Sequence, residues 1–147
     1  MDELDKLILR LLNSDARLSL REIARRTDSS LGTVSLRIKR LEGEGVINGY
    51  IPVLDGEKLG YTLSALISIR IARGKLVSVQ EKIALDTRVQ SVYDITGEWD
   101  SVAIAHFRDR KDLNNFVKKL LSMENVERTN TQIALNIIKD ERRWTVG

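Results

Sequence analysis

The sequence contains no cysteine and only one histidine, His106. Without cysteine the chain has no disulfide bond, no thiol nucleophile and no thiolate ligands for zinc. One histidine does not support a metal site built on imidazoles. A lone histidine in a predicted strand is also more often packed and hydrogen-bonded than catalytic. The chain has no phosphate-binding glycine loop and no Ser-His-carboxylate set. We therefore expect no enzymatic activity and no metal site.

Long apolar segments are also absent. No run of 18 or more apolar residues occurs, so we expect no membrane span. The start, Met1-Asp2-Glu3, is acidic and unlike a signal peptide, and we expect a cytoplasmic protein. Hydrophobic residues make up 42% and charged residues 31% of the chain, which is typical of a globular protein. A length of 147 residues permits one domain or two small ones.

The net charge is only +3, but the positive charge is concentrated. Residues 1–15 hold two basic and four acidic residues, a net of −2. Residues 16–41 hold seven basic and two acidic residues, a net of +5. A basic block on a nearly neutral chain fits a localised anionic partner surface such as DNA.

The most informative segment is residues 30–41. Val34, Ile38 and Leu41 recur at i, i+4 and i+7, which predicts one buried face of a helix. Ser30 is a suitable N-cap, because its hydroxyl can accept a bond from a backbone N–H of the first turn. The other positions supply small polar groups and cations: Thr33, Ser35, Arg37, Lys39 and Arg40. Such a surface suits the DNA major groove, although an ordinary amphipathic helix with a solvated face has the same pattern.

The upstream segments favour the DNA-binding alternative. Helical spacing of leucine and isoleucine predicts a first helix at about residues 2–13. Ser19-Leu20-Arg21-Glu22 has the form of a capping box and begins a second helix. A short polar connection over residues 27–29 then leads into the third helix. Three helices with a tight turn before the third predict a helix-turn-helix domain, winged-helix-like, over residues 1–50.

The chain changes character after residue 43. Residues 46–53 contain strand-forming residues and an Asn-Gly turn signal, and the single proline, Pro52, lies here. We place a linker strand or hinge at residues 51–61. Beyond it, strands are predicted at 63–71, 89–96, 101–107 and about 126–138, and helices at 75–86 and 111–122. The fold class is therefore α+β, with a second domain at 62–147 of βαββαβ, ferredoxin-like architecture and both helices on one sheet face.

This architecture leaves the other sheet face uncovered. Leu66, Ala134 and either Val102 or Ala103 would be exposed in a monomer. An exposed, partly apolar sheet face on a small domain usually marks an interface. We infer a homodimer packed sheet to sheet.

Several short motifs occur in a characteristic order. In the first fifty residues they are Asp2, Asp5 and Ile8-Leu9; Asp15-Ala16-Arg17; Glu22-Ile23-Ala24; Thr33-Val34, Arg37-Ile38 and Arg40-Leu41-Glu42; and Gly45-Val46-Ile47 with Gly49-Tyr50. In the second half they are Leu59-Gly60-Tyr61, Gly97 with Asp100, and Val126 with Thr129 and Thr131. Through these motifs essentially the whole chain resembles the Lrp/AsnC family of leucine-responsive, or feast/famine, regulators.

The chain departs from this family before the third helix. Asp28-Ser29-Ser30 stands where the family usually has Gly-Leu-Ser, and Gly32 replaces a better helix former. Aspartate tolerates the left-handed conformation better than most residues, so we expect the turn to persist.

The resemblance implies a transcription regulator that binds double-stranded DNA as a dimer, tetramer or octamer. Thr33, Ser35 and Arg37 would read base edges, with Ser30 beside them at the helix start. Lys39, Arg40, Arg21 and Arg25 would hold phosphates. An architectural DNA-wrapping protein of the same fold is the alternative. RNA binding is disfavoured, because the sheet lacks paired surface aromatics that stack bases.

The resemblance also implies an amino-acid effector, bound between sensing domains near the Gly-x-x-Asp turn, and no other cofactor. Gly97, Trp99 and Asp100 would line that site, and Thr131 would face the effector. The same residues also fit a plain hairpin. In that alternative Gly97 has positive φ, Asp100 bonds the turn backbone, Trp99 packs under a neighbour and Thr131 belongs to a polar sheet face.

Overall fold

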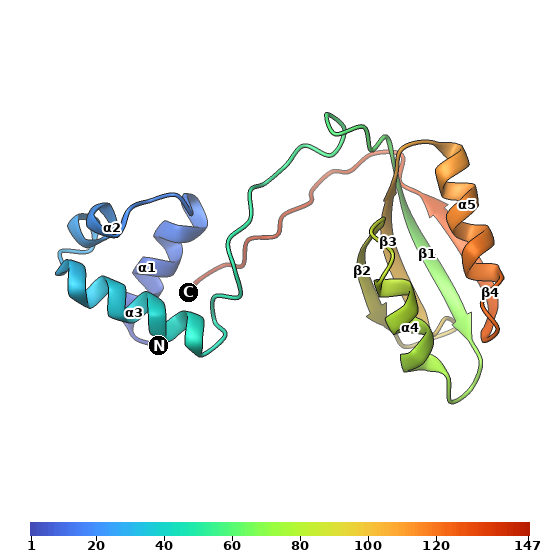
Figure 1. The fold of residues 1–147 in the computed structure, drawn as a ribbon, viewed down its shortest axis with the longest axis horizontal. Coiled ribbons are helices and arrows are strands. Elements are labelled where there is room, and N and C mark those ends of the chain that lie inside the picture. The colour runs from blue at the N-terminus through green and yellow to red at the C-terminus, as the bar shows by residue number, and fades with distance from the viewer. The chain divides into compact units, whose positions relative to one another are not determined.

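The structure is a computed structural model that describes all residues, 1–147, and it divides into two compact units (Figure 1). The first unit comprises Met1–Val53 together with Lys139–Gly147, and the second comprises Leu54–Ile138. Our sequence-based range of 62–147 for the second domain included the last nine residues, which the structure groups with the first unit. None of the helices is long and apolar enough to span a membrane.

The first unit contains three helices, α1 (Glu3–Ser14), α2 (Leu20–Arg26) and α3 (Leu31–Gly43). A side-chain oxygen caps each start, because Asp2, Ser19 and Ser30 each accept a bond from the backbone N–H three residues on. The capping box predicted at Ser19 is only half formed, since the Glu22 carboxylate bonds Arg25 and Arg26 instead of the Ser19 backbone. A complete capping box forms at α1, between Asp2 and Asp5.

The core of the first unit joins all three helices. Ile8, Ile23 and Ala24 pack with Val34 and Ile38, and Leu41 is also fully buried, which confirms the predicted inner face of α3. Asp28 has a φ of 49°, so the turn before α3 does use the left-handed conformation at this residue. The departure from the family pattern therefore leaves the turn in place, as expected.

Residues 44–62 contain neither a helix nor a strand, so the strand predicted at the linker is wrong. Val46 and Ile47 donate their backbone N–H groups to the Leu41 carbonyl at 2.9 and 3.1 Å, and this turn follows α3. A strand needs a second segment that pairs with its backbone groups, and no backbone hydrogen bond joins residues 48–54 to another segment. Val53 is 91% exposed.

The second unit has the order β1 (Leu63–Ile71), α4 (Leu76–Ala84), β2 (Val89–Asp94), β3 (Ser101–Phe107), α5 (Arg110–Leu121) and β4 (Val126–Ile133). The strands form one antiparallel sheet in the order β2-β3-β1-β4, which confirms the predicted βαββαβ fold (Figure 1). β4 ends at Ile133 and not near residue 138. Its only partner, β1, begins at Leu63, so the residues after Ala134 have no backbone to pair with.

Alternation along the strands separates a covered face from an open face. Residues of β1 and β3 that include Ile67 and Phe107 pack against α4 and α5, so both helices cover the same face. The opposite face carries Leu66, which is 40% exposed, and the half-buried Val102. Ala103 is fully buried, so the open-face residue of that pair is Val102. His106 is half-buried and hydrogen-bonded to Ser64 and Gln90, as expected for a packed histidine.

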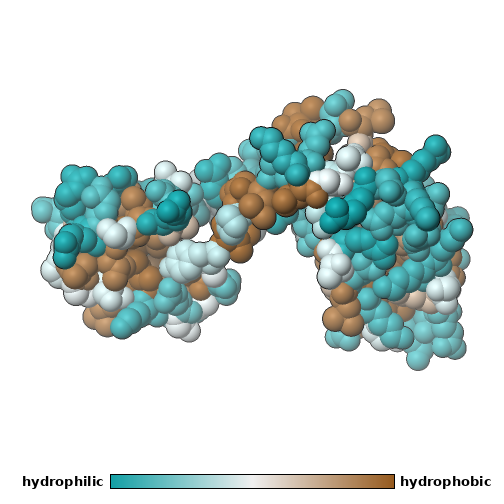
Figure 2. All heavy atoms as spheres, turned by 45° about the horizontal axis from the view of Figure 1, so that its top comes forward, coloured by the Kyte–Doolittle hydropathy of each residue, from teal (hydrophilic) through white to brown (hydrophobic).

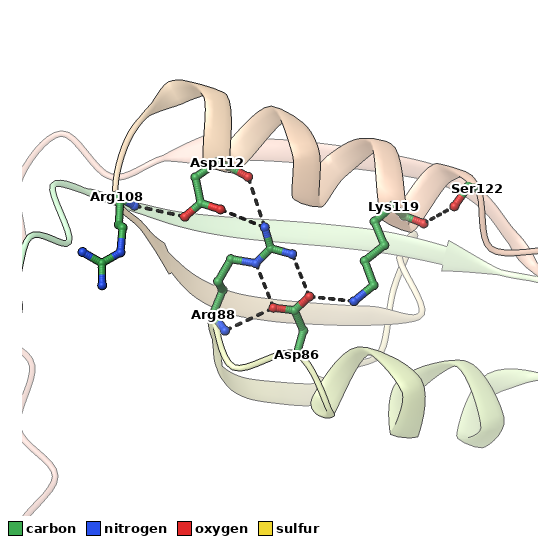
Figure 3. A network of polar contacts seen from close by, with 6 residues as sticks. All are labelled: Asp86, Arg88, Arg108, Asp112, Lys119 and Ser122. Atoms are coloured by element: carbon green, nitrogen blue, oxygen red, sulfur yellow. Dashed lines mark hydrogen bonds and ion pairs between the residues drawn. The ribbon is translucent and has the colours of Figure 1, made fainter.

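A polar network ties the two helices of the second unit to the sheet (Figure 3). Arg88, at the edge of β2, makes two 2.8 Å bonds to Asp86 after α4 and one to Asp112 on α5. Lys119 on α5 also reaches Asp86, at 2.9 Å. Hydrogen bonds from Arg88 hold the pKa of the Asp86 carboxyl well below its usual range, although burial opposes the shift. The network is a structural clamp that the hydrophobic pattern did not predict.

Candidate functional site

The outer face of α3 is the candidate nucleic-acid interface. Because Val34, Ile38 and Leu41 face the core, the opposite side of the helix faces solvent. This side presents Leu36, which is 70% exposed, and the exposed Lys39. Figure 2 shows hydrophobic atoms at the surface of this unit, between hydrophilic ones. The helix therefore offers solvent a mixed surface of apolar groups, small polar groups and cations.

Two of the predicted phosphate-binding cations are unpaired. Arg21 on α2 and Lys39 on α3 are exposed and form no ion pair or side-chain hydrogen bond. Arg25 is exposed but shares Glu22 with Arg26, at 2.7 Å from each. These bonds, the one from Arg25 foremost, lower the pKa of Glu22 to about 2. Positive charge that is free to meet an anion is thus concentrated on Arg21 and Lys39.

Arg37 and Arg40 are engaged with acidic residues at the start of α1, a contact that the sequence-based prediction did not include. Arg37 Nη1 lies 2.5 Å from Asp2 and 3.2 Å from Asp5, and Arg40 Nη2 lies 2.6 Å from Asp5. Asp5 is fully buried. A buried carboxylate needs charged partners, and these two guanidiniums supply them. Arg37 therefore anchors α1 to α3 through its ion pairs with Asp2 and Asp5.

Electrostatics agree with this anchor. Burial by itself raises the pKa of Asp5. Hydrogen bonds from the Asp2 backbone N–H and from the two guanidiniums lower this pKa by a larger amount together, so the net shift is downward. The pKa of Asp2 falls to about 2, first because its carboxylate accepts the Asp5 backbone N–H and next because Arg37 donates to it. Both carboxylates are thus ionised at neutral pH and hold the start of α1 against α3.

The three predicted hydroxyl contacts are placed differently from one another. Ser30 and Thr33 are exposed at the start of α3, where the Ser30 oxygen accepts the Thr33 backbone N–H at 3.1 Å and lies 2.8 Å from its hydroxyl. Ser35 is half-buried and lines an apolar cleft with Leu18 and Ile38. Ser30 and Thr33 are exposed, whereas Ser35 is half-buried in a cleft that Lys39 also lines.

Sequence reasoning missed Leu36 on this face, and it treated Gly32 only as a departure from the family pattern. Leu36 lies two residues from both Val34 and Ile38, so helical geometry places it on the opposite side. Spacing alone would have revealed its exposure, but we considered only the polar residues of that face. The buried role of Asp5, by contrast, has no local signal, because its partners are more than 30 residues away.

The turn between β2 and β3 contains the predicted effector residues Gly97, Trp99 and Asp100. Gly97 has a φ of 108°, which favours glycine. Asp100 Oδ2 accepts the Ile71 backbone N–H at 2.8 Å, and the Asp100 backbone N–H donates to Ile69 at 3.1 Å. The positive φ of Gly97 agrees with the hairpin alternative, but that alternative had Asp100 bonding the turn backbone, whereas these two Asp100 bonds are to β1. They position the turn against β1, and they leave Asp100 Oδ1 without a partner.

Two arginines gather at this turn. The Arg128 guanidinium lies 4.7 Å from the centre of the Trp99 ring and 2.7 Å from the Glu98 carboxylate. Arg70, which pairs with Arg128 across the sheet, donates to the Glu98 carbonyl oxygen. Sequence reasoning did not include either arginine. The sequence predicts that each arginine lies on a strand. It does not predict that the two lie side by side, because this depends on the register between β1 and β4.

Thr131 does not share this site. It pairs with Ile67, whose side chain is buried beneath the helices, and it lines a groove with Leu113 and Val117 of α5. Thr131 therefore lies on the covered face of the sheet, whereas Arg128 and Arg70 alternate onto the other face. Within one chain the structure therefore does not bring Thr131 together with the turn, and its predicted contact with an effector stays a prediction.

Both units match known family models. Residues 1–48 match the model for a winged helix-turn-helix DNA-binding domain, and residues 64–144 match the Lrp/AsnC ligand-binding domain. The chain belongs to the Lrp/AsnC family. The relatives that match this chain are transcriptional regulators. The helix-turn-helix unit is the DNA-binding part of this Lrp/AsnC protein.

Relatives match over nearly the whole length. An HTH-type transcriptional regulator of Pyrococcus furiosus is 49% identical, over 97% of each chain. A transcriptional regulator of Neisseria meningitidis, solved as a complex with L-Met, is 28% identical with a TM-score of 0.90, covering 99% of this chain and 96% of its own. The leucine response regulatory protein of Mycobacterium tuberculosis is 28% identical with a TM-score of 0.84, covering all of both chains. This Lrp/AsnC protein thus shares both sequence and fold with transcriptional regulators.

Proposed function

We propose that this Lrp/AsnC regulator reads a specific DNA sequence with α3 and acts as a dimer or larger oligomer whose second unit senses an amino acid. The observation that carries the proposal is the outer face of α3. It combines the accessible hydroxyls of Ser30 and Thr33 with the unpaired cation Lys39, next to unpaired Arg21 on α2. Hydroxyls suit base edges, and unpaired cations suit phosphates.

Lys39 and Arg21 hold DNA phosphates in this proposal, whereas Arg37 and Arg40 orient α3. A lost phosphate contact lowers the slope of log affinity against log salt by about 0.9. We expect Lys39→Ala and Arg21→Ala each to weaken binding to every duplex and to reduce that slope. Fluorescence anisotropy of labelled duplexes at several salt concentrations measures both quantities. Lys82→Ala, which removes an exposed cation from α4, is the matched control. If Lys39→Ala and Arg21→Ala both keep the wild-type salt slope, the assignment of these two cations to phosphates is wrong.

Oligomerisation is proposed through the open face of the sheet. Leu66 is 40% and Tyr93 52% exposed there, beside the half-buried Val102 and Ile104. A second copy packed on this face would remove these apolar groups from water. We expect a dimer or multiple of it by native mass measurement, and Leu66→Asp to yield monomers. A wild-type protein that is monomeric at micromolar concentration would contradict the proposal.

Effector sensing is proposed at the turn of residues 97–100. The free Asp100 Oδ1 can accept an ammonium group, and the Arg128 guanidinium can pair with a carboxylate. An α-amino acid carries both groups, and the relative solved with L-Met supports this class of ligand. The bond between Arg128 and Glu98 must then be exchanged for the bond to the ligand.

A thermal-shift panel of the twenty amino acids tests the sensing proposal. A ligand that binds only the folded state raises stability by RT ln(1 + [L]/Kd), or about 2.7 kcal/mol at 100 times Kd. We expect at least one amino acid to raise the melting temperature, and Asp100→Asn or Arg128→Ala to abolish the shift. Asp94→Asn, an exposed carboxylate at the end of β2, is the control. No shift with any amino acid, together with binding to random DNA, would favour an architectural protein.

A further inference from the structure

One line of residues along α3 projects furthest from the core, and we call it the α3 crest: Gly32, Leu36 and Lys39. Leu36 is 70% exposed, although it lies on a helix whose other large aliphatic residues beyond the first turn are buried. The neighbours of Leu36 on the crest are a glycine one turn before it and a cation one turn after it. Leu36 is thus the sole bulky apolar group at the centre of this surface.

Gly32 is not required by the fold. Its φ is not in the left-handed region, and a Cβ added there would meet nothing closer than the Ser30 hydroxyl at 3.9 Å. Glycine in a helix is less favourable than alanine, by up to about 1 kcal/mol in the interior and by less in the first turn, where Gly32 lies. The chain therefore accepts a destabilising residue at a position with open space in front of it. A glycine of this kind is explained if another molecule must approach the helix backbone closely.

The DNA major groove explains both residues together. The groove is about as wide as a helix with its side chains, so the face that enters it must be thin. Among the groups that bases expose in this groove, the thymine C5-methyl is the apolar one. We propose that Leu36 contacts thymine methyl groups and that Gly32 lets α3 approach closely enough for this contact. The inference rests on the proposed sequence-specific DNA binding and deepens it, because it names a feature of the sequence that is read.

The test uses the full-length protein and a duplex selected by the wild type from a randomised pool. Each thymine in the selected duplex is replaced singly by uracil, which lacks only the methyl group. Burial of one methyl group corresponds to about fourfold in affinity. We expect about a fourfold loss at one or two positions for the wild type and no change at the other thymines. We expect Leu36→Ala to bind thymine and uracil duplexes equally. Leu85→Ala, which truncates an 82% exposed leucine outside the DNA-binding unit, should retain the discrimination.

Gly32→Ala provides an independent arm. We expect the melting temperature of this variant to rise by up to about 5 °C, because alanine favours the helix. Affinity for the selected duplex should fall at least fourfold, since the added methyl group holds α3 away from the groove floor. A variant that gains stability and retains full affinity would overturn the role of Gly32.

The outcomes separate this inference from the proposed function. If the wild type enriches no sequence from the pool, sequence-specific DNA binding itself fails. If it selects a sequence but binds every uracil duplex as tightly as the thymine duplex, only the methyl contact is refuted. The uracil series alters no protein residue, so its result does not depend on how the Leu36 variant folds.

Discussion

The anchor between α1 and α3 makes a strong prediction about stability. Asp5 is fully buried, accepts the Asp2 backbone N–H at 2.8 Å and pairs with Arg37 and Arg40. Asp5→Ala removes all three interactions and leaves two guanidiniums without their common partner. We expect this substitution to destabilise the first unit and to leave the second unit unchanged, because the contacts lie entirely within the first.

The magnitude follows from the exposure of the partners. Removing one member of a buried ion pair costs about 3–5 kcal/mol. The Arg37 and Arg40 side chains are 27% and 42% exposed and can regain water, so the lower end of this range applies. A loss of about 3 kcal/mol corresponds to roughly 150-fold faster exchange through unfolding and, for a unit of this size, to a melting temperature about 12 °C lower or more.

Hydrogen exchange read by mass spectrometry on the full chain measures each unit separately. We expect faster exchange in peptides from α3 and unchanged exchange in peptides from α5. Asp5→Asn retains the shape but not the charge, and it should show an intermediate effect. Glu3→Ala is the control, since its 2.7 Å pair with Lys6 is at the surface and is worth at most about 1 kcal/mol. If Asp5→Ala accelerates exchange no more than Glu3→Ala, the anchor has no energetic role and Arg37 returns as a candidate base reader.

Three further predictions concern pH, the turn and the second unit. The pKa of Asp2 is lowered from 3.8 to about 2, so its contribution is present above pH 3.8 and is lost as pH falls through 2; protection of the α3 amides, measured against their intrinsic exchange rates, should fall across this window, and less so in Asp2→Asn. Because Asp28 has positive φ, denaturant unfolding should find Asp28→Gly at least as stable as the wild type and Asp28→Ala less stable by about 1 kcal/mol. Arg88→Ala leaves the Asp86 side chain, only 7% exposed, with Lys119 alone, and should cost the second unit about 3 kcal/mol; a loss no larger than that of Lys119→Ala would contradict the clamp.

Local sequence signals predicted much of the fold. The alternation over residues 63–71 predicted β1, and the repeat of Val34, Ile38 and Leu41 predicted the buried face of α3. The Ser30 cap and the left-handed Asp28 were also expected, because both depend on bonds and dihedral angles within a few residues. The order of elements then restricted the second unit to one topology.

Side-chain roles at the candidate sites were predicted less well. Arg37 carries the same charge whether it contacts a base or a carboxylate, and the buried carboxylate of Asp5 lies 32 residues away. Thr131 was grouped with the turn but lies on the face that the helices cover, because strand alternation indicates that two faces exist but not which one is covered. The meeting of Arg70 with Arg128 depends in the same way on strand register.

The linear sequence thus determined the helices, the strands, their order and the position of a basic block, because short-range periodicity and capping encode them. Only the tertiary structure decided which cations remain free. Arg37 and Arg40 are paired with carboxylates at the start of another helix, while Arg21 and Lys39 form no ion pair. The type of each residue determines its charge. Whether two charges pair depends on the distance between them, and for residues far apart in the sequence that distance is set by folding.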